Sequence, residues 1–198
     1  TAKDFNPRIL ELYDHSAHGK MTKRELLKSI GKYTAASVTA LSVFNNLMPN
    51  YALAEQVNFN DPEIKANYIT YNSGNGNGKI NAYYVKPSKI TEKTSAVLVI
   101  HENRGLNPYI KDVARRVAKA GFIALAPDGL SSLGGYPGND AEGKILQKKI
   151  DREKLLNDFF NAFEFLLNHQ DTNKKIGAVG FCYGGGVCNA LAVAYPEL

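Results

Sequence analysis

A cysteine stands between glycines in "GFCYGGG", residues 180–186, where an apolar run gives way to small residues. The pattern G-x-C-x-G is typical of a nucleophile on a sharp strand-to-helix turn, because its strained backbone excludes larger side chains two positions away on either side. The following helix directs free N–H groups and a positive dipole at the thiol, which favours the thiolate. Cys182 is therefore a candidate nucleophile. The alternative is a glycine-rich turn that holds an inert, buried thiol.

A cysteine nucleophile needs a base, and the four histidines do not supply an obvious one. His15 and His18 lie in the N-terminal region, and His169 ends a long predicted helix. His101 follows a predicted core strand, where it either approaches Cys182 or lines the loop as a structural residue. No histidine or aspartate follows Cys182 in this sequence.

The two cysteines, Cys182 and Cys188, are six residues apart on a turn and its helix, a poor geometry for a disulfide bond. Neither a CxxC motif nor a Cys/His cluster with zinc spacing is present. A phosphate-cradling loop and a dinucleotide fingerprint are also missing from the sequence. We therefore expect neither a metal nor a cofactor, and cysteine usage leaves the redox compartment open.

The elements that must position Cys182 follow from hydrophobic periodicity. Two β-branched and aromatic runs flank "NSGNGNG" and predict a β-hairpin. Beyond it, strands are predicted at residues 95–100, 122–127 and 175–181, and helices at residues 107–121, 151–169 and 183–197. Alternating strands and helices favour an α/β sheet with a parallel core and helices on both faces.

The N-terminal region has two interpretations. "TKRELLK" is close to a twin-arginine signal, with Lys23 in the place of the first arginine, and Ala52-Leu53-Ala54 resembles a cleavage site. The alternative is an amphipathic helix over residues 22–48. We assign residues 1–56 to a helical extension and 57–198 to the main domain. Localisation stays open: cytoplasmic if the segment is retained, periplasmic if it is exported.

The overall composition excludes several classes of protein. With 44% apolar and 22% charged residues, the chain is typical of a globular protein. A net charge of +5, scattered among acidic residues and without interleaved aromatic residues, favours a solvated surface over nucleic-acid binding. Apolar stretches are broken too often by polar residues to predict a membrane span.

"GFCYGGG", together with "VIHENRGLNPYIKDVARRVAKAGFIALAPDGLSS", is similar to the dienelactone hydrolase family of α/β-hydrolases, over roughly residues 64–198. The resemblance implies a mixed, mostly parallel sheet with helices on both faces and a cysteine nucleophile at Cys182. It implies that Glu102 tunes the thiol. It also implies an oxyanion hole from the backbone N–H groups of Asn103 and Tyr183.

The sequence departs from the family pattern in two respects. Residues 127–140 contain no arginine to grip a substrate carboxylate, which leaves Arg104 and Tyr136 as weaker candidates for substrate contacts. The family's acid and histidine follow the nucleophile and would lie beyond residue 198.

We therefore expect an ester or lactone hydrolase that this chain represents incompletely. A C-terminal remainder of the same fold, as a second chain or a further segment, would complete it. A homodimer is another state of assembly to consider. The alternative function is a non-catalytic α/β domain whose Cys182 thiol is redox-sensitive or inert.

Overall fold

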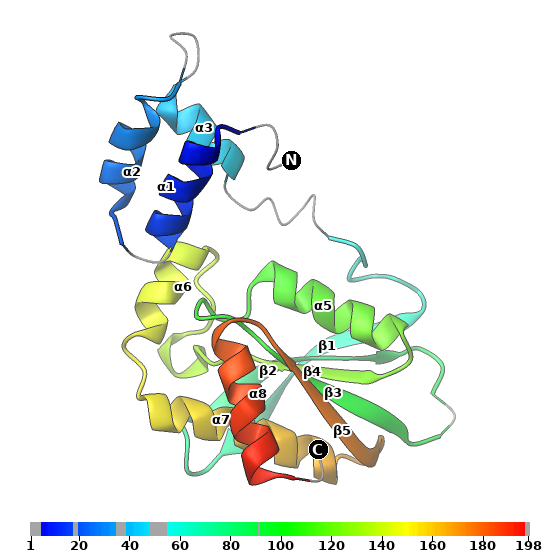
Figure 1. The fold of residues 1–198 in the computed structure, drawn as a ribbon. Coiled ribbons are helices and arrows are strands. Elements are labelled where there is room, and N and C mark those ends of the chain that lie inside the picture. The colour runs from blue at the N-terminus through cyan, green and yellow to red at the C-terminus, as the bar shows by residue number, and fades with distance from the viewer. Residues whose placement is uncertain (1–4, 18–19, 35–38, 48–54, 91, 197–198) are drawn as a thin grey trace. The chain divides into compact units, whose positions relative to one another are not determined.

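The computed structural model describes residues 5–17, 20–34, 39–47, 55–90 and 92–196. The chain divides into two compact units, residues 1–50 and 51–198 (Figure 1). Among the described residues, no helix is long and apolar enough to cross a membrane.

The first unit contains the helices α1 (Pro7–Ala17), α2 (Lys23–Ile30) and α3 (Ala40–Leu47). A small apolar core joins them, made of Ile9, Leu26, Ile30 and Phe44 with partly buried neighbours. The expectation of one helix over residues 22–48 is wrong, because α2 ends at Gly31 and a separate helix follows. Thr22 begins α2 with a capping box that includes Glu25. The assignment of this region as a leader stays a prediction, and the cleavage-like Ala52-Leu53-Ala54 lies outside the described residues.

The predicted hairpin is confirmed. The strands β1 (Ile64–Ser73) and β2 (Gly78–Pro87) pair in antiparallel over their full lengths. The turn between them is fixed to the interior by buried Asp158, which accepts hydrogen bonds from the Asn77 backbone N–H at 2.8 Å and side chain at 2.6 Å. The hairpin is thereby attached to the second unit's core rather than left as an isolated ribbon.

Three further strands complete the sheet: β3 (Thr94–Ile100), β4 (Ile123–Pro127) and β5 (Thr172–Gly180). The strand order is β1-β2-β4-β3-β5, with β3 parallel to both β4 and β5 and the hairpin antiparallel to β4. The predicted mixed α/β fold is therefore confirmed. Within the described residues β5 pairs with β3 alone, so its other edge is unpaired.

Helices cover both faces of the sheet, as predicted (Figure 1). The helix α5 (Pro108–Lys119) lies on one face, and α7 (Arg152–Asn168) and α8 (Tyr183–Ala194) lie on the other. Their apolar stripes drive this packing. The stripe of α5 contains Ile110, Val113, Ala114 and Ala118, and that of α7 and α8 contains Leu155, Phe159, Ala162, Phe163, Leu166, Val187 and Leu191.

The short helix α6 (Asp140–Gln147) was not predicted. Its signal is a capping pair: the Asn139 side chain accepts a hydrogen bond from the Glu142 N–H at 2.9 Å. An eight-residue helix without a continuous apolar stripe gives little periodicity to detect. It nevertheless contributes side chains to the site described next.

Candidate active site around Cys182

The backbone at Cys182 is strained in the manner expected of a nucleophile elbow. With φ 53° and ψ −108°, Cys182 occupies left-handed backbone space between β5 and α8, although it carries a side chain. The Phe181 N–H donates to the Ile100 carbonyl at 3.1 Å, which ties the turn to the end of β3. The thiol is exposed at this end of the parallel strands.

The flanking glycines are required by close backbone contacts. A Cβ atom on Gly180 would lie 2.1 Å from the Gly184 carbonyl oxygen. One on Gly184 would lie 2.5 Å from the Ile100 carbonyl oxygen. Both obstacles are main-chain atoms of core elements, which cannot move aside as a flexible side chain can. Gly180 is thus required by its contact with the start of α8, and Gly184 by its contact with the end of β3.

A pocket of about 420 Å³ is lined by Cys182 and by both residues predicted to form the oxyanion hole. Cys182, Asn103 and Tyr183 line it together. Within the part of the chain that the structure describes, neither the Asn103 N–H nor the Tyr183 N–H donates a hydrogen bond. The other lining residues are Lys144, Gln147, Lys148, Arg152 and Leu155. Two unused donors beside a thiol are what a developing oxyanion needs.

The Tyr183 phenol is not suited to act as a base at neutral pH. Burial raises the pKa of Tyr183 to about 12. The phenol is therefore protonated at neutral pH. The backbone N–H of Tyr183 stays the predicted contribution of this residue to the site.

His101 is a structural residue of the loop after β3. Its ring is buried, its Nε2 accepts a hydrogen bond from the Gly129 N–H at 3.0 Å, and its Nδ1 lies 2.5 Å from the Glu102 carbonyl oxygen. Nδ1 therefore carries the proton, and both ring nitrogens are engaged. Burial also lowers the pKa of His101, which keeps the ring neutral. Of the two interpretations of this histidine, the structural one is correct.

The other three candidate residues belong to a cluster around Asp140: Glu102, Arg104 and Tyr136. The Asp140 carboxylate accepts hydrogen bonds from Arg104 Nη1 and from the Tyr136 hydroxyl, both at 2.9 Å. Asn107 Nδ2 contacts Asp140 Oδ1 at 3.5 Å and Glu102 Oε2 at 3.3 Å. Among the described residues lining the Cys182 pocket, Asn103 is present, whereas the candidates of this cluster are absent. Proximity of the Glu102 carboxylate to the sulfur stays a prediction.

Asp140 fastens α6 to the loop that carries Asn103. Asp140 forms an ion pair with Arg104. In addition, a Cβ atom on Gly143 would lie 2.0 Å from the Arg104 carbonyl oxygen, so α6 and this loop are in direct backbone contact. Burial raises the pKa of the Glu102 carboxyl above its usual range. The negative charge of Asp140 raises it further, and the positive charge of Arg104 opposes both.

We expect Asp140→Asn to lower the pKa of Glu102. The substitution removes the anionic charge that disfavours ionisation of Glu102 and releases the Arg104 cation from its partner, and both changes favour the carboxylate. Loss of the charged contacts should also lower the free energy of unfolding by about 2 kcal/mol. An NMR titration of the Glu102 side-chain carboxyl carbon measures the first effect. Glu142→Gln, an exposed change on the same helix, is the matched control, and an equal effect in both variants would contradict this assignment.

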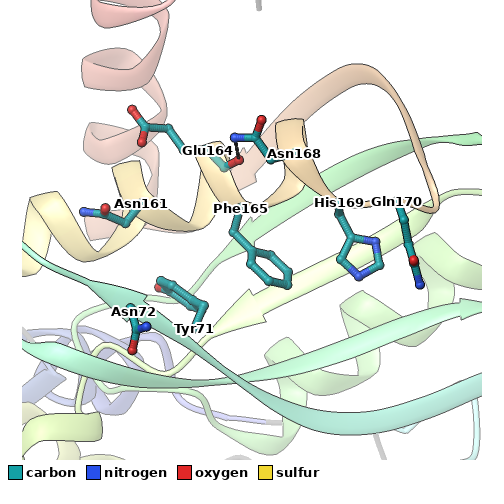
Figure 2. A pocket seen from close by; sticks show the side chains of 8 residues that line it. All are labelled: Tyr71, Asn72, Asn161, Glu164, Phe165, Asn168, His169 and Gln170. Atoms are coloured by element: carbon teal, nitrogen blue, oxygen red, sulfur yellow. Dashed lines mark hydrogen bonds between the residues drawn. The ribbon is translucent and has the colours of Figure 1, made fainter.

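A second pocket, of about 520 Å³, lies away from these residues (Figure 2). It is lined by Tyr71, Asn72, Asn161, Glu164, Phe165, Asn168, His169 and Gln170, from β1 and the C-terminal half of α7. The ring of His169 packs against Phe165, with centroids 5.3 Å apart, and its Nδ1 accepts a hydrogen bond from the Asp171 N–H at 3.3 Å. His169 therefore lines a pocket that shares no lining residue with the Cys182 pocket.

Sequence reasoning missed the residues that α6 and the start of α7 bring to the site. Lys144, Lys148 and Arg152 line the Cys182 pocket, and Asp140 organises the loop behind it. The capping signature at Asn139 could have indicated α6. Nothing in the local pattern indicates that this helix packs beside residues 103 and 182.

Comparison with family models gives two matches. Residues 80–198 match the model described as the dienelactone hydrolase family. Residues 1–32 match a model described as YqhI-like.

Individual relatives agree with the first match. The chain is 68% identical over 114 residues to "Putative hydrolase fragment YghX" of Escherichia coli (strain K12), covering 58% of this chain and 97% of that protein. It is 31% identical over 121 residues to a "Putative carboxymethylenebutenolidase" of Yersinia pestis, covering 59% of this chain and 45% of that one. A crystal structure described as a putative dienelactone hydrolase from Klebsiella pneumoniae superposes with a TM-score of 0.57 at 25% identity, covering 68% of this chain and 57% of that chain. The chain thus spans about half the length of the last two proteins.

Proposed function

Because the chain belongs to the dienelactone hydrolase family, we propose that it takes part in hydrolysing an ester or lactone with Cys182 as the nucleophile. One observation carries this proposal: Cys182, exposed on a strained elbow, lines one pocket together with Asn103 and Tyr183, whose backbone N–H groups have no acceptor among the described residues. An ordinary structural turn has no need of such strain.

The proposed reaction begins with attack of the Cys182 thiolate on the carbonyl carbon of the substrate. The carbonyl oxygen becomes an oxyanion, which the N–H groups of Asn103 and Tyr183 stabilise, each by on the order of 3 kcal/mol. Collapse expels the alkoxide, which takes up a proton, and leaves a thioester on the sulfur. Water then attacks the thioester and releases the acid and the thiol.

Glu102 is proposed to tune the thiol. Its carboxyl is half-buried and is in contact with Asn107, a member of the cluster around Asp140. Glu102 also directly precedes Asn103 in the chain. A carboxyl whose pKa is raised by burial can accept or release a proton nearer neutrality than an exposed one. We propose that Arg104 and Tyr136, through Asp140, position this loop rather than grip the substrate directly.

The base is proposed to come from a C-terminal remainder of the same fold, as a second chain or a further segment. The unpaired edge of β5 is suited to such a partner because its backbone N–H and C=O groups can extend the sheet. A second copy of this chain at the same edge is the alternative assembly.

We expect Cys182 to react with iodoacetamide at neutral pH at least about tenfold faster than Cys188. Cys182 is exposed at the N-terminus of α8, whereas Cys188 is half-buried and its burial raises the pKa of its thiol. Peptide mass spectrometry after timed alkylation of the full chain measures both rates in one molecule, so Cys188 is the internal control.

Equal rates for the two cysteines would favour the inert-thiol alternative. A fast reaction with iodoacetamide, but no acylation of Cys182 by an activated phenyl ester, would favour a redox-sensitive thiol instead. Fast alkylation together with acylation of Cys182 is the result that supports the proposed hydrolase.

A further inference from the structure

The pocket at Cys182 has a strongly one-sided charge. Lys144 and Lys148, from α6 and its end, and Arg152, the first residue of α7, line it. None of its lining residues within the described chain is an aspartate or glutamate. Asn103, Gln147, Leu155 and Tyr183 complete the lining without charge. Among the described residues, the charged side chains that line this pocket are therefore all cationic.

Two of these cations have no partner in the described part of the chain. Neither Lys148 nor Arg152 forms an ion pair or a side-chain hydrogen bond there. This contrasts with Lys86, whose Nζ lies 2.6 Å from Asp171. Lys144, which shares α6 with acidic residues, is not one of these two cations. The pocket thus offers two positive charges that the protein itself does not neutralise.

One of these cations, Arg152, acts on the residue that directly follows the candidate nucleophile. Burial and the negative charge of Asp158 raise the pKa of the Tyr183 phenol, and the positive charge of Arg152 opposes them. Tyr183 follows Cys182 directly, and both stand at the N-terminus of α8, where the helix dipole is also positive. The charge of Arg152 and the helix dipole therefore have the same sign at this end of α8.

Resting on the proposed role of Cys182, we propose that this pocket selects substrates that carry a doubly charged anionic group, held by Lys148 and Arg152. Two unneutralised cations match two negative charges, on either a pair of carboxylates or a phosphate monoester. The guanidinium of Arg152 suits both, because its paired N–H donors match two oxygens of one anionic group. Residues 127–140, the segment after β4, contain no arginine that could bind the anion. In this proposal the anion is bound by residues at the end of α6 and the start of α7.

Alkylation of Cys182 by two reagents of similar size tests the charge directly. Iodoacetate is an anion and iodoacetamide is neutral, and in both reactions the thiolate displaces iodide. Their rate ratio therefore cancels changes in thiol pKa and in access. We expect the iodoacetate-to-iodoacetamide ratio at Cys182 to exceed that at Cys188 in the same full-length chain.

Removing the two cations should lower that ratio. In the double variant Lys148→Gln, Arg152→Gln we expect it to fall about threefold to tenfold, the effect of two nearby charges in a wet pocket. Lys149→Gln is the matched control, because Lys149 is an exposed neighbour of Lys148 that does not line the pocket. An unchanged ratio in the double variant, or an equal fall in the control, would overturn the proposal.

Protection experiments on the unmodified chain test the number of charges and the source of the anion. At matched ionic strength, succinate, malonate, phosphate and acetate each compete with iodoacetamide for Cys182. We expect at least one dianion to protect at a concentration about tenfold below that of acetate. Protection by the dicarboxylates alone or by phosphate alone identifies the group, whereas equal protection by acetate overturns the proposal. These readouts need no turnover, so they stand apart from any failure to hydrolyse esters.

Discussion

Replacing Gly184 by alanine is expected to lower the free energy of unfolding of the second unit by about 3 kcal/mol or more. The new methyl group would lie 2.5 Å from the Ile100 carbonyl oxygen, so either the elbow or the end of β3 must shift. A shift would also break the hydrogen bond from the Phe181 N–H to Ile100. The pairing of β3 with β5 would be weakened at the same point.

Gly186→Ala is the matched control two residues along α8. Its Cβ atom would meet nothing within 4 Å, and alanine favours a helix over glycine by up to about 1 kcal/mol. Urea denaturation of both variants, followed by circular dichroism, measures the difference. If Gly184→Ala proved as stable as Gly186→Ala, the close contact between the elbow and β3 would not exist in solution.

Cys182→Ala should reduce ester hydrolysis by the native assembly by about a thousandfold or more in kcat/KM, because no other group at the pocket can form the thioester. Cys182→Ser should retain at most a small fraction of activity, since a hydroxyl ionises far less readily than a thiol. Cys188→Ala serves as the control and should stay close to the unsubstituted protein.

The same preparation tests the proposed completion of the fold. Native mass spectrometry should find this chain bound to a second polypeptide of the same fold, or continuous with a further segment, whenever hydrolysis is observed. Hydrolysis that survives Cys182→Ala would remove the nucleophile from the proposal. Full activity from a lone chain of 198 residues would remove the need for a partner.

Periodicity predicted most of the second unit. Apolar runs such as residues 95–100 gave the buried strands, and Pro108 and Gly121 bracketed α5, whose N-cap is Asn107. The helix α6 escaped prediction because its eight residues have no long apolar stripe. The break between α2 and α3 escaped because small and β-branched residues extend the helical pattern past Gly31 without fixing where it ends.

The candidate site was likewise predictable from the sequence only in part. Cys182 and its glycines were predictable because strain on a turn imposes a local composition. The cluster around Asp140 was not, because it joins the loops after β3 and β4 to α6, and only tertiary packing brings these together. The placement of Arg152 beside Tyr183 has the same origin. Local sequence thus predicts the nucleophile, whereas its charged surroundings depend on how distant loops meet.

The hydrogen bond from the Phe181 N–H to Ile100 has a consequence for the order of events during biosynthesis. The chain between β3 and β5 contains β4, α5, α6 and α7, all of which leave the ribosome before the elbow does. Until β5 aligns with β3, nothing supports the strained conformation of Cys182, so the nascent thiol has an ordinary, relaxed backbone. The strain at Cys182 therefore arises only once β5 aligns with β3, so any reactivity that the strain gives to the thiol would begin at that step of folding.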